Sequence, residues 1–340
     1  MKALVYHGPK DLRLEEVEGV FPKEHEVKIK VKAIGICGSD VHGYAGLTGR
    51  RLPPMIMGHE FSGEIVEVGQ AVTDFKVGDR VAPYPVEICG ECEFCRRDMT
   101  HICLNKRAYG VLDCNGAMAE YICVPGNIVF KLSDCVDYST GAMVEPMAVA
   151  LRGVDNAGDL QGKNVLILGA GTIGLFTLAH VKTRNPAKIF VSDLSDTRLA
   201  VAKQMGADVV LRSDKLDVVQ AVRDATDGLG VDVSIECVGI TPTTKQAVSS
   251  LKLGGTTVWV GNSQKLIEAD MQEIVTHELT VRGSFLYTLK QFERCVEILG
   301  QGQVDISPII SREIKLEEAP EMFRTLYENP GDLIKVVILQ

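Results

Sequence analysis

The first third of the chain is built from short runs in which apolar and polar residues alternate. A period of two is typical of strands with one buried face. Turn-forming pairs such as Gly8-Pro9 and Pro53-Pro54 separate the runs. This pattern predicts a mostly β module of the partly open barrel type. Its predicted strands are Lys2–Tyr6, Glu26–Ala33, Phe61–Val68, Arg80–Pro83 and Ala119–Cys123.

Further along, the pattern changes to helical spacing and then to short, wholly apolar runs. A connecting helix is expected from Gly141, with an interruption near Pro146. Apolar runs then alternate with helical segments such as Asp196–Met205 and Lys215–Thr226. Alternating β and α elements at this spacing predict an α/β domain with a doubly wound parallel (Rossmann) sheet. Its predicted strands are Asn164–Leu168, Lys188–Ser192, Val209–Leu211, Val233–Cys237, Thr257–Val260 and Thr280–Gly283.

The length of 340 residues and this change of pattern predict two domains. The helix Leu289–Leu299 and the strand Ile334–Leu339 are expected to return to the first domain. We therefore assign residues 1–148 and 288–340 to the mostly β domain and residues 149–287 to the α/β (Rossmann) domain. With 46% apolar residues, each domain can bury a core of its own.

Composition argues against several classes of partner. The chain has 36 basic and 45 acidic residues, which gives a net charge of −9, and no basic stripe interleaved with aromatic residues is visible. A nucleic-acid partner is therefore not expected. No apolar stretch is long enough to span a bilayer, and the N-terminus lacks the apolar segment of a secretory signal. We expect a cytoplasmic protein without a membrane or nucleic-acid partner.

A glycine-rich segment indicates a dinucleotide site. Gly169-Ala-Gly171-Thr-Ile-Gly174 follows a predicted strand and opens a helix. Glycines let the backbone approach a pyrophosphate, whose charge is stabilised by the N–H groups at the helix N-terminus. Asp193 lies 19 residues beyond Gly174, where a carboxylate binds the adenosine ribose and repels a 2′-phosphate. The pattern predicts NAD rather than NADP, with Arg198 as a further residue at this site.

Four cysteines in the segment 87–105 predict a structural zinc lobe. Their spacing, C-x2-C-x2-C-x7-C, suits a closed tetrahedral zinc site. An iron–sulfur cluster would favour a three-residue gap and a following proline, whereas Leu104 stands here. We expect His101 to be a surface residue and the isolated cysteines to be small apolar residues. The four predicted ligands are Cys89, Cys92, Cys95 and Cys103.

The segment Ile36–Gly69 predicts a second metal site, of the catalytic type. It holds a thiol, imidazoles and carboxylates close together on a glycine-rich stretch. Ligands on loops with polar neighbours suit a zinc ion that keeps one position open for substrate. The candidate residues are Cys37, Ser39, Asp40, His42, His59 and Glu60.

These motifs together resemble a known family. The run Gly58-His59-Glu60-x2-Gly63-x5-Gly69-x2-Val72 is similar to the signature of zinc-containing medium-chain alcohol dehydrogenases. The Cys-Gly-Ser-Asp segment, the cysteine lobe and the glycine loop stand in that family's order, and the likeness extends over the whole chain. Glu145-Pro146 resembles the polyol branch, which includes sorbitol, threonine and galactitol-phosphate dehydrogenases.

The resemblance implies an NAD-dependent zinc dehydrogenase that acts on a secondary alcohol of a polyol, sugar acid or polyol phosphate. Two zinc ions per chain are expected. Cys37 and His59 would be fixed ligands of the catalytic zinc, and Glu60 and Glu145 would share the remaining protein position. Ser39 and His42 would relay the proton. The alternative is an inactive NAD-binding sensor or structural protein of the same superfamily.

The resemblance also implies further contacts. The expected cofactor residues are Gly169, Gly171, Thr172, Ile173, Gly174, Asp193, Arg198, Val238, Val260 and Gly261. The expected substrate residues are Tyr44, Arg50, Arg51 and Tyr287. The two arginines either clamp an anionic substrate, or are solvated loop charges, or pair with a neighbouring subunit. Gly43 stands where sorbitol dehydrogenase has a tyrosine. A homodimer or homotetramer is expected, joined through the edge strand Thr280–Gly283.

Overall fold

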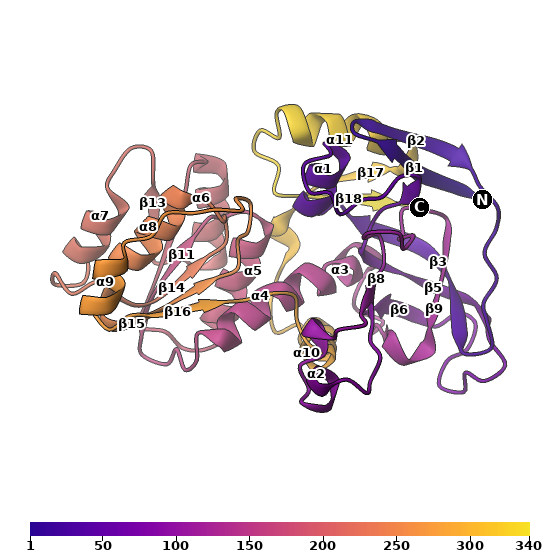
Figure 1. Ribbon diagram of the computed structural model, residues 1–340, viewed down its shortest axis with the longest axis horizontal. Coiled ribbons are helices and arrows are strands. Elements are labelled where there is room, and N and C mark those ends of the chain that lie inside the picture. The colour runs from indigo at the N-terminus through magenta and orange to yellow at the C-terminus, as the bar shows by residue number, and fades with distance from the viewer. The chain divides into compact units, whose positions relative to one another are not determined.

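The computed structural model describes residues 1–340. The chain forms two compact units (Figure 1). Unit 1 comprises Met1–Glu145 and Thr288–Gln340, and unit 2 comprises Pro146–Tyr287. The boundaries predicted from the sequence lie after residues 148 and 287. None of the helices combines the length and the apolar character that a bilayer-spanning helix needs.

Unit 1 is dominated by antiparallel strands. A seven-stranded sheet has the order β10-β6-β5-β3-β18-β17 with β9 also pairing β3, and β2-β1-β4 form a smaller sheet. A ribbon of β7 and β8 stands apart. The strands are β1 (Lys2–Gly8), β2 (Asp11–Glu16), β3 (Glu26–Gly35), β4 (Met55–Ile56), β5 (Glu60–Val68), β6 (Arg80–Pro83), β7 (Val86–Glu87), β8 (Arg107–Ala108), β9 (Tyr121–Pro125), β10 (Val129–Lys131), β17 (Ile310–Lys315) and β18 (Lys335–Leu339).

Strand β3 is central to unit 1. Val27, Ile29 and Val31 alternate with lysines along it, and all three apolar side chains are fully buried. This alternation places one face of the strand in the core. β3 pairs with β5, β9 and β18, so the last strand of the chain lies beside one of the first. Figure 1 shows both termini in this unit.

The helices of unit 1 are α1 (Gly38–Tyr44), α2 (Glu93–Arg96), α3 (Tyr138–Ala142), α10 (Leu289–Gly300) and α11 (Ala319–Glu328). Helix α4 (Val144–Asn156) begins in unit 1 and continues into unit 2. The interruption expected near Pro146 is wrong in position, because the helical segments are separated at Met143. Pro146 lies in the first turn of α4, where a proline removes no intrahelical hydrogen bond.

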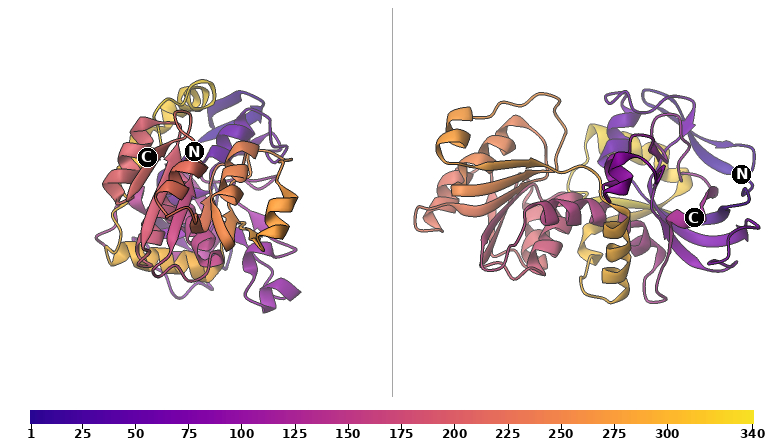
Figure 2. Two further views of the ribbon diagram at one scale, coloured as in Figure 1. Left: turned by 90° about the vertical axis from the view of Figure 1, so that its left-hand side faces the viewer. Right: turned by 60° about the horizontal axis from the view of Figure 1, so that its bottom comes forward.

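Unit 2 is a six-stranded parallel sheet. Its strands are β11 (Asn164–Leu168), β12 (Lys188–Asp193), β13 (Val209–Arg212), β14 (Val231–Glu236), β15 (Leu251–Trp259) and β16 (Thr280–Gly283). Besides α4, its helices are α5 (Thr172–Lys182), α6 (Asp196–Met205), α7 (Val218–Asp224), α8 (Thr241–Ser249) and α9 (Met271–Thr276). Helices lie on both faces of the sheet (Figure 2). Val165, Leu166 and Ile167 are fully buried, as expected for a strand that is covered on both faces.

The strand order β13-β12-β11-β14-β15-β16 confirms the predicted doubly wound sheet. Every neighbouring pair is parallel. The strand order reverses between β11 and β14, so the loops that follow these strands run in opposite directions. Ligands of such sheets bind outside the carboxyl ends of the strands at this switch point.

Candidate metal and dinucleotide sites

The residues of the predicted catalytic metal site come together because strands β3 and β5 pair at this place. Cys37 follows β3 and is the N-cap of α1. His59 directly precedes β5, whose first residue, Glu60, lies opposite Gly35 of β3. One ligand atom from each of Cys37, His59 and Glu60 lies within 4.8 Å of the others.

Two glycines make this arrangement possible. A Cβ atom at position 35 would lie 2.1 Å from Oε2 of Glu60, so any side chain there would displace the carboxylate. Gly58 has a φ of +96°, and a Cβ atom there would lie 2.8 Å from Cγ of Met118. The backbone before His59 therefore requires glycine for both its conformation and its packing.

Buried charges surround the metal-type residues. Oδ1 of Asp40 lies 3.5 Å from Nδ1 of His59, and NH2 of Arg51 donates to the same oxygen at 2.7 Å. Burial raises the pKa of Asp40, but the charges of His59 and Arg51 outweigh burial and hold this pKa well below its usual range. Asp40 is therefore a carboxylate. Conversely, Asp40 and the Cys37 thiol raise the pKa of His59 against the opposing effect of burial.

Lys335 is a buried charged residue beside Glu60 that the sequence analysis missed. It comes from β18, and its Nζ donates to Oε2 of Glu60 at 2.6 Å and to the carbonyl of Ile36 at 3.0 Å. Both side chains of the ion pair are almost fully buried. Burial lowers the pKa of Lys335, but the charges of Glu60 and Cys37 raise this pKa by more than burial lowers it. The side chain therefore stays in its ammonium form. A lysine within the apolar run Lys335–Leu339 was the signal available in the sequence.

The remaining predicted catalytic residues occupy different positions around this group. The Ser39 hydroxyl is 3.4 Å from Sγ of Cys37, and Ser39 and His42 are both exposed on α1. Glu145 is buried and lies outside the group of Cys37, His59 and Glu60, although its charge contributes to the raised pKa of Lys335. The structure thus brings together three of the four predicted ligands.

The four lobe cysteines form a second cluster, at the end of the ribbon of β7 and β8. Their sulfur atoms all lie within 4.8 Å of one another, with distances of 3.4 Å for Cys103–Cys89 and 3.9 Å for Cys92–Cys103. Four sulfurs arranged tetrahedrally at Zn–S distances of about 2.3 Å would be about 3.8 Å apart. Backbone N–H groups lower the pKa of Cys92 to about 6, which favours its thiolate. The cluster fits a closed zinc site.

The predicted dinucleotide loop connects β11 to α5 at the switch point of the sheet. Gly171 is the N-cap of α5, and Thr172, Ile173 and Gly174 form its first turn. A Cβ atom at Gly174 would lie 1.7 Å from the carbonyl oxygen of Gly169. Only glycine permits this close approach, and a glycine turn that opens a helix is a typical place for backbone N–H groups to bind a phosphate.

Two carboxylates hold the loops at this edge of the sheet. Asp193, at the end of β12, accepts hydrogen bonds from the N–H groups of Ala170 at 2.7 Å and Ser195 at 2.9 Å. Glu236, at the end of β14, accepts from the N–H groups of Val238 and Gly239 at 2.8 and 2.7 Å. The sequence analysis missed Glu236, although an acidic residue at the end of an apolar strand was the same signal as for Asp193.

The other predicted cofactor residues lie at the same edge. A Cβ atom at Gly261 would be 2.2 Å from the Gly239 nitrogen, so the loops after β14 and β15 touch backbone to backbone. Val238 lies beside the glycine loop, because a Cβ atom at Gly169 would be 2.6 Å from its Cγ2. Val260 follows β15 and donates its N–H to the carbonyl of Glu236, and its side chain lies against Gly153 of α4. Arg198 lies in the first turn of α6, where its N–H donates to the Ser195 hydroxyl.

Comparison with known proteins agrees with this geometry. Residues 23–134 match the alcohol dehydrogenase GroES-like domain, and residues 172–301 match the zinc-binding dehydrogenase domain. Sorbitol dehydrogenase of Bacillus subtilis (strain 168) is 32% identical over 99% of this chain and 97% of its own length. L-idonate 5-dehydrogenase of Vitis vinifera is 34% identical over 92% of this chain and 87% of its own.

A solved structure shows the same likeness. The crystal structure of a zinc-binding dehydrogenase from Sinorhizobium meliloti 1021 bound to NADP has a TM-score of 0.93 and 34% identity, and covers 100% of this chain and 99% of its own.

The chain belongs to the zinc-binding dehydrogenase family. The predicted family, fold class, reaction class and zinc and nicotinamide cofactors are thereby confirmed. The alternative of an inactive sensor has no support among the relatives. Mixed donors at Cys37, His59 and Glu60 fit a catalytic zinc, and four thiols fit a structural one.

Some predicted contacts of the dehydrogenase differ in the structure. Arg51 was expected to bind an anionic substrate or to be solvated, but its guanidinium is buried against Asp40. Tyr44 packs its ring on Phe323 at 5.6 Å, because the inner face of α1 contacts α11. Tyr287 is likewise buried, whereas Arg50 is exposed. His101 was expected at the surface but is only 4% exposed within the lobe.

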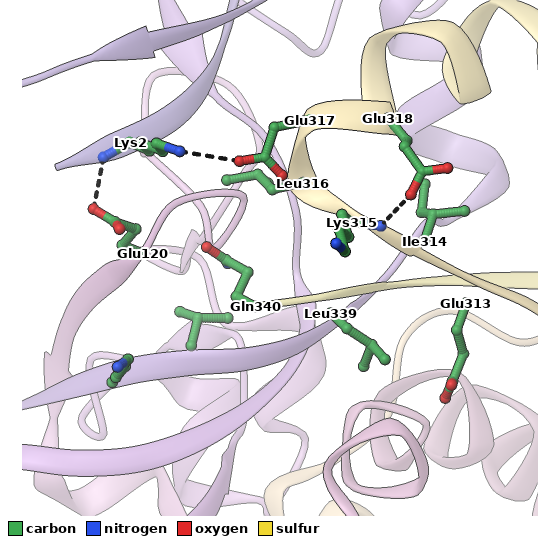
Figure 3. A pocket seen from close by; sticks show the side chains of 12 residues that line it. Lys2, Glu120, Glu313, Ile314, Lys315, Leu316, Glu317, Glu318, Leu339 and Gln340 are labelled. Carbon is green, nitrogen blue, oxygen red and sulfur yellow. Dashed lines mark hydrogen bonds and ion pairs between the residues drawn. The ribbon is translucent and has the colours of Figure 1, made fainter.

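One hollow of unit 1 is lined by none of the residues of the two metal-type clusters. It has a volume of about 660 Å³ and is lined by residues of β1, β17, β18 and the turn after β17 (Figure 3). Lys2 pairs with Glu317 at 3.0 Å and donates its N–H to Glu120 at 2.8 Å. We assign this hollow no role in the dehydrogenase reaction, because none of the candidate site residues lines it.

Proposed function

We propose that this dehydrogenase oxidises a secondary alcohol of a polyol, sugar acid or polyol phosphate and transfers its hydride to NAD. The observation that carries the proposal is the convergence of Cys37, His59 and Glu60 in a chain with a glycine loop at the switch point of a parallel sheet. The named substrates of the two relatives, a polyol and a sugar acid, support this range.

The test is a screen for NAD reduction over polyols, sugar acids, sugar phosphates and amino alcohols, combined with a measurement of zinc per chain. We expect turnover with at least one of the first three classes and two zinc ions per chain. Activity confined to amino alcohols would contradict the proposed substrate range. If the protein turned over no class of substrate and held a single zinc ion per chain, the proposal that it is an active dehydrogenase would be contradicted.

In this proposal Cys37 and His59 are the fixed ligands of the catalytic zinc, and Glu60 and Glu145 share the third protein position. When bound, zinc supplies a Lewis acid that lowers the pKa of the substrate hydroxyl. Glu60 is held by Lys335 through one carboxylate oxygen, Oε2. This ion pair fixes the direction of the carboxylate beside Cys37 and His59, which together with Glu60 or Glu145 would hold the metal.

Ser39 and His42 provide the route for the proton. The exposed Ser39 hydroxyl is beside Cys37 and is therefore placed to accept the proton of an alcohol bound there. His42 is three residues further along α1 and is also exposed. An imidazole can both accept and donate a proton, so the exposed His42 is suited to pass the proton to solvent.

We further propose that NAD is preferred to NADP. Asp193 ends β12, and its negative charge would oppose a 2′-phosphate. Arg212 lies opposite Asp193 in the adjacent strand, but its guanidinium is paired with Asp214 at 2.6 Å and with Asp196 at 2.7 Å. The Arg212 guanidinium, which could otherwise bind a 2′-phosphate, is therefore already paired with two carboxylates. A higher kcat/KM with NADP than with NAD would contradict this preference.

An anionic group on the substrate could bind only one of the two arginines. Arg50 is exposed, whereas Arg51 is committed to Asp40. If Arg50 binds a phosphate or carboxylate, Arg50→Ala should raise KM about tenfold for an anionic substrate, which corresponds to about 1.4 kcal/mol. A neutral polyol should be unaffected. Equal effects on both substrates would rule out this contact.

We propose that the enzyme is a homodimer or homotetramer. Strand β16 is the edge of the parallel sheet, and all four of its residues are exposed. An open edge strand with unpaired backbone groups is normally covered, and pairing with the same strand of a second copy would cover it symmetrically. Light scattering at micromolar concentration should give at least twice the chain mass, and a monomer would contradict the proposal.

We also propose a cytoplasmic location. All ten cysteines are free thiols, which suits a reducing compartment. Fractionation of the source cells would test this, since activity recovered outside the cytoplasmic fraction would contradict it.

A further inference from the structure

Arg51 is buried, whereas the neighbouring Arg50 in the loop between α1 and β4 is exposed. The Arg51 side chain is 3% exposed and that of its partner, Asp40, is fully buried. A guanidinium is rarely buried unless it is paired, because the cost of removing it from water is large. The pair of Arg51 and Asp40 is therefore a buried ion pair of the protein interior and not an incidental surface ion pair.

A single nitrogen of Arg51 reaches two residues of α1. NH2 donates to Oδ1 of Asp40 at 2.7 Å and lies 3.4 Å from the Ser39 hydroxyl. Asp40 in turn faces Nδ1 of His59, and Ser39 contacts the Cys37 sulfur. Arg51 thus contacts both residues that adjoin the two fixed metal-type ligands.

Gly43 provides the space for this side chain. A Cβ atom at position 43 would lie 2.6 Å from Cγ of Arg51 and 3.3 Å from its Nε. The φ of Gly43 is not in the left-handed region, so its backbone conformation does not require glycine. The requirement comes from packing, because the aliphatic part of Arg51 lies directly against this residue of α1. The glycine and the arginine therefore act together.

We propose that Arg51 is a positioning residue of the catalytic metal site and that Gly43 leaves the space that the Arg51 side chain needs. The proposal rests on the proposed function, in which Cys37 and His59 hold zinc. Arg51 fixes Asp40 beside Nδ1 of His59, and the other ring nitrogen would then be the one available to hold a metal. Partners of this kind are typically worth 10- to 100-fold in metal affinity or activity.

The test compares four variants. Arg51→Met keeps much of the aliphatic stem and removes the charge, and Arg51→Lys keeps the charge but loses the planar fork. Gly43→Ala keeps every charge and displaces the Arg51 stem. Arg13→Met is the matched control, because it breaks an exposed arginine–aspartate pair elsewhere in unit 1. Zinc retention against a competing chelator, kcat and KM are measured for each purified full-length protein.

We expect Arg51→Met to weaken the retention of one of the two zinc ions by roughly 10- to 100-fold. Its kcat should fall more than its KM for NAD changes. Arg51→Lys should recover part of the loss, and Gly43→Ala should shift retention and kcat in the same direction as Arg51→Met. Arg13→Met should retain zinc as the wild type does. If Arg51→Met does not fold, the results for Gly43→Ala and Arg51→Lys decide the proposal.

The outcomes separate this proposal from the proposed function. If the wild type holds two zinc ions and is active while the Arg51 and Gly43 variants match Arg13→Met, the positioning role is wrong and the proposed function stands. Variants that lose stability but keep kcat and zinc retention also overturn it, because they show a structural role only. A wild type with one zinc ion and no dehydrogenase activity overturns both proposals.

Discussion

The two metal-type clusters of unit 1 differ in how they are built. The lobe cluster draws four identical donors from one short stretch, and backbone N–H groups lower the pKa of two of them, Cys89 and Cys92. The other cluster draws a thiol from the start of α1 and an imidazole and a carboxylate from the start of β5. Buried charges from Asp40, Arg51 and Lys335 surround it. A site that only holds a loop in shape can be local, whereas a site that performs chemistry needs partners from distant parts of the chain.

The largest effect should come from the mixed-donor cluster. Cys37→Ser or His59→Ala should lower kcat/KM by at least about 10³-fold, since the Lewis acid contributes several kcal/mol to catalysis. NAD binding should persist, because the dinucleotide loop lies in the other unit. Steady-state kinetics and a fluorescence titration with NADH check this. A variant with near-wild-type turnover would show that the metal site is assigned wrongly.

The next effect should come from the buried ion pair. Lys335→Met should lower the free energy of unfolding by about 3 kcal/mol, because it leaves the Glu60 carboxylate buried without its cation. Loading with zinc should reduce this loss, since the metal replaces the missing positive charge. Denaturant unfolding of the zinc-loaded and zinc-depleted proteins measures both quantities.

Lys2→Met is the matched control for that experiment. It breaks an exposed lysine–glutamate pair in the same unit, and exposed pairs contribute little to stability. We therefore expect little change with or without zinc. Equal losses for Lys335→Met and Lys2→Met would mean that burial does not govern the Glu60 pair.

Disrupting the lobe cluster should lower stability and leave catalysis largely unchanged. Cys95→Ser opens the closed site, so the chain should lose one zinc ion and its melting temperature should fall by roughly 5 °C. At temperatures where the variant is folded, kcat should stay close to that of the wild type. Calorimetry and zinc analysis check this, and an unchanged melting temperature would argue against a structural metal in the lobe.

The smallest effect should appear in unit 2. Asp193→Ser should lower the preference for NAD over NADP by about tenfold, since a charge that repels the 2′-phosphate is removed. It should also loosen the glycine loop, because Asp193 accepts the Ala170 N–H. The ratio of kcat/KM values for the two cofactors measures the first effect. An unchanged ratio would assign the preference to other residues.

Local patterns predicted most of the fold. Arg80–Pro83, Asn164–Leu168 and Asp196–Met205 were predicted at the bounds that the structure has. Alternating or continuous apolar residues mark these segments, and turn or capping residues flank them. Pro146 was a weaker guide, because a proline ends a helix from within but is tolerated in the first turn.

The candidate site could be predicted only in part. Cys37, His59 and the lobe cysteines were visible because spacing along the chain encodes them. Lys335 and Arg51 were not assigned correctly, since their partners are set by strand pairing and by the packing of α1. The pairing of β18 with β3 brings Lys335 to Glu60, and no local pattern specifies that pairing. Likewise, Gly43 makes room for Arg51 eight residues away.

The central claim is that one zinc ion serves the reaction and the other serves the fold. Its most direct test is a stepwise chelation of the full-length protein in which zinc content, NAD-dependent turnover and melting temperature are measured on the same samples. We predict that activity disappears with the loss of the first zinc ion while the melting temperature stays nearly constant, and that it returns when zinc is restored. If activity were lost only with the second zinc ion, together with a drop in melting temperature, the account would be contradicted.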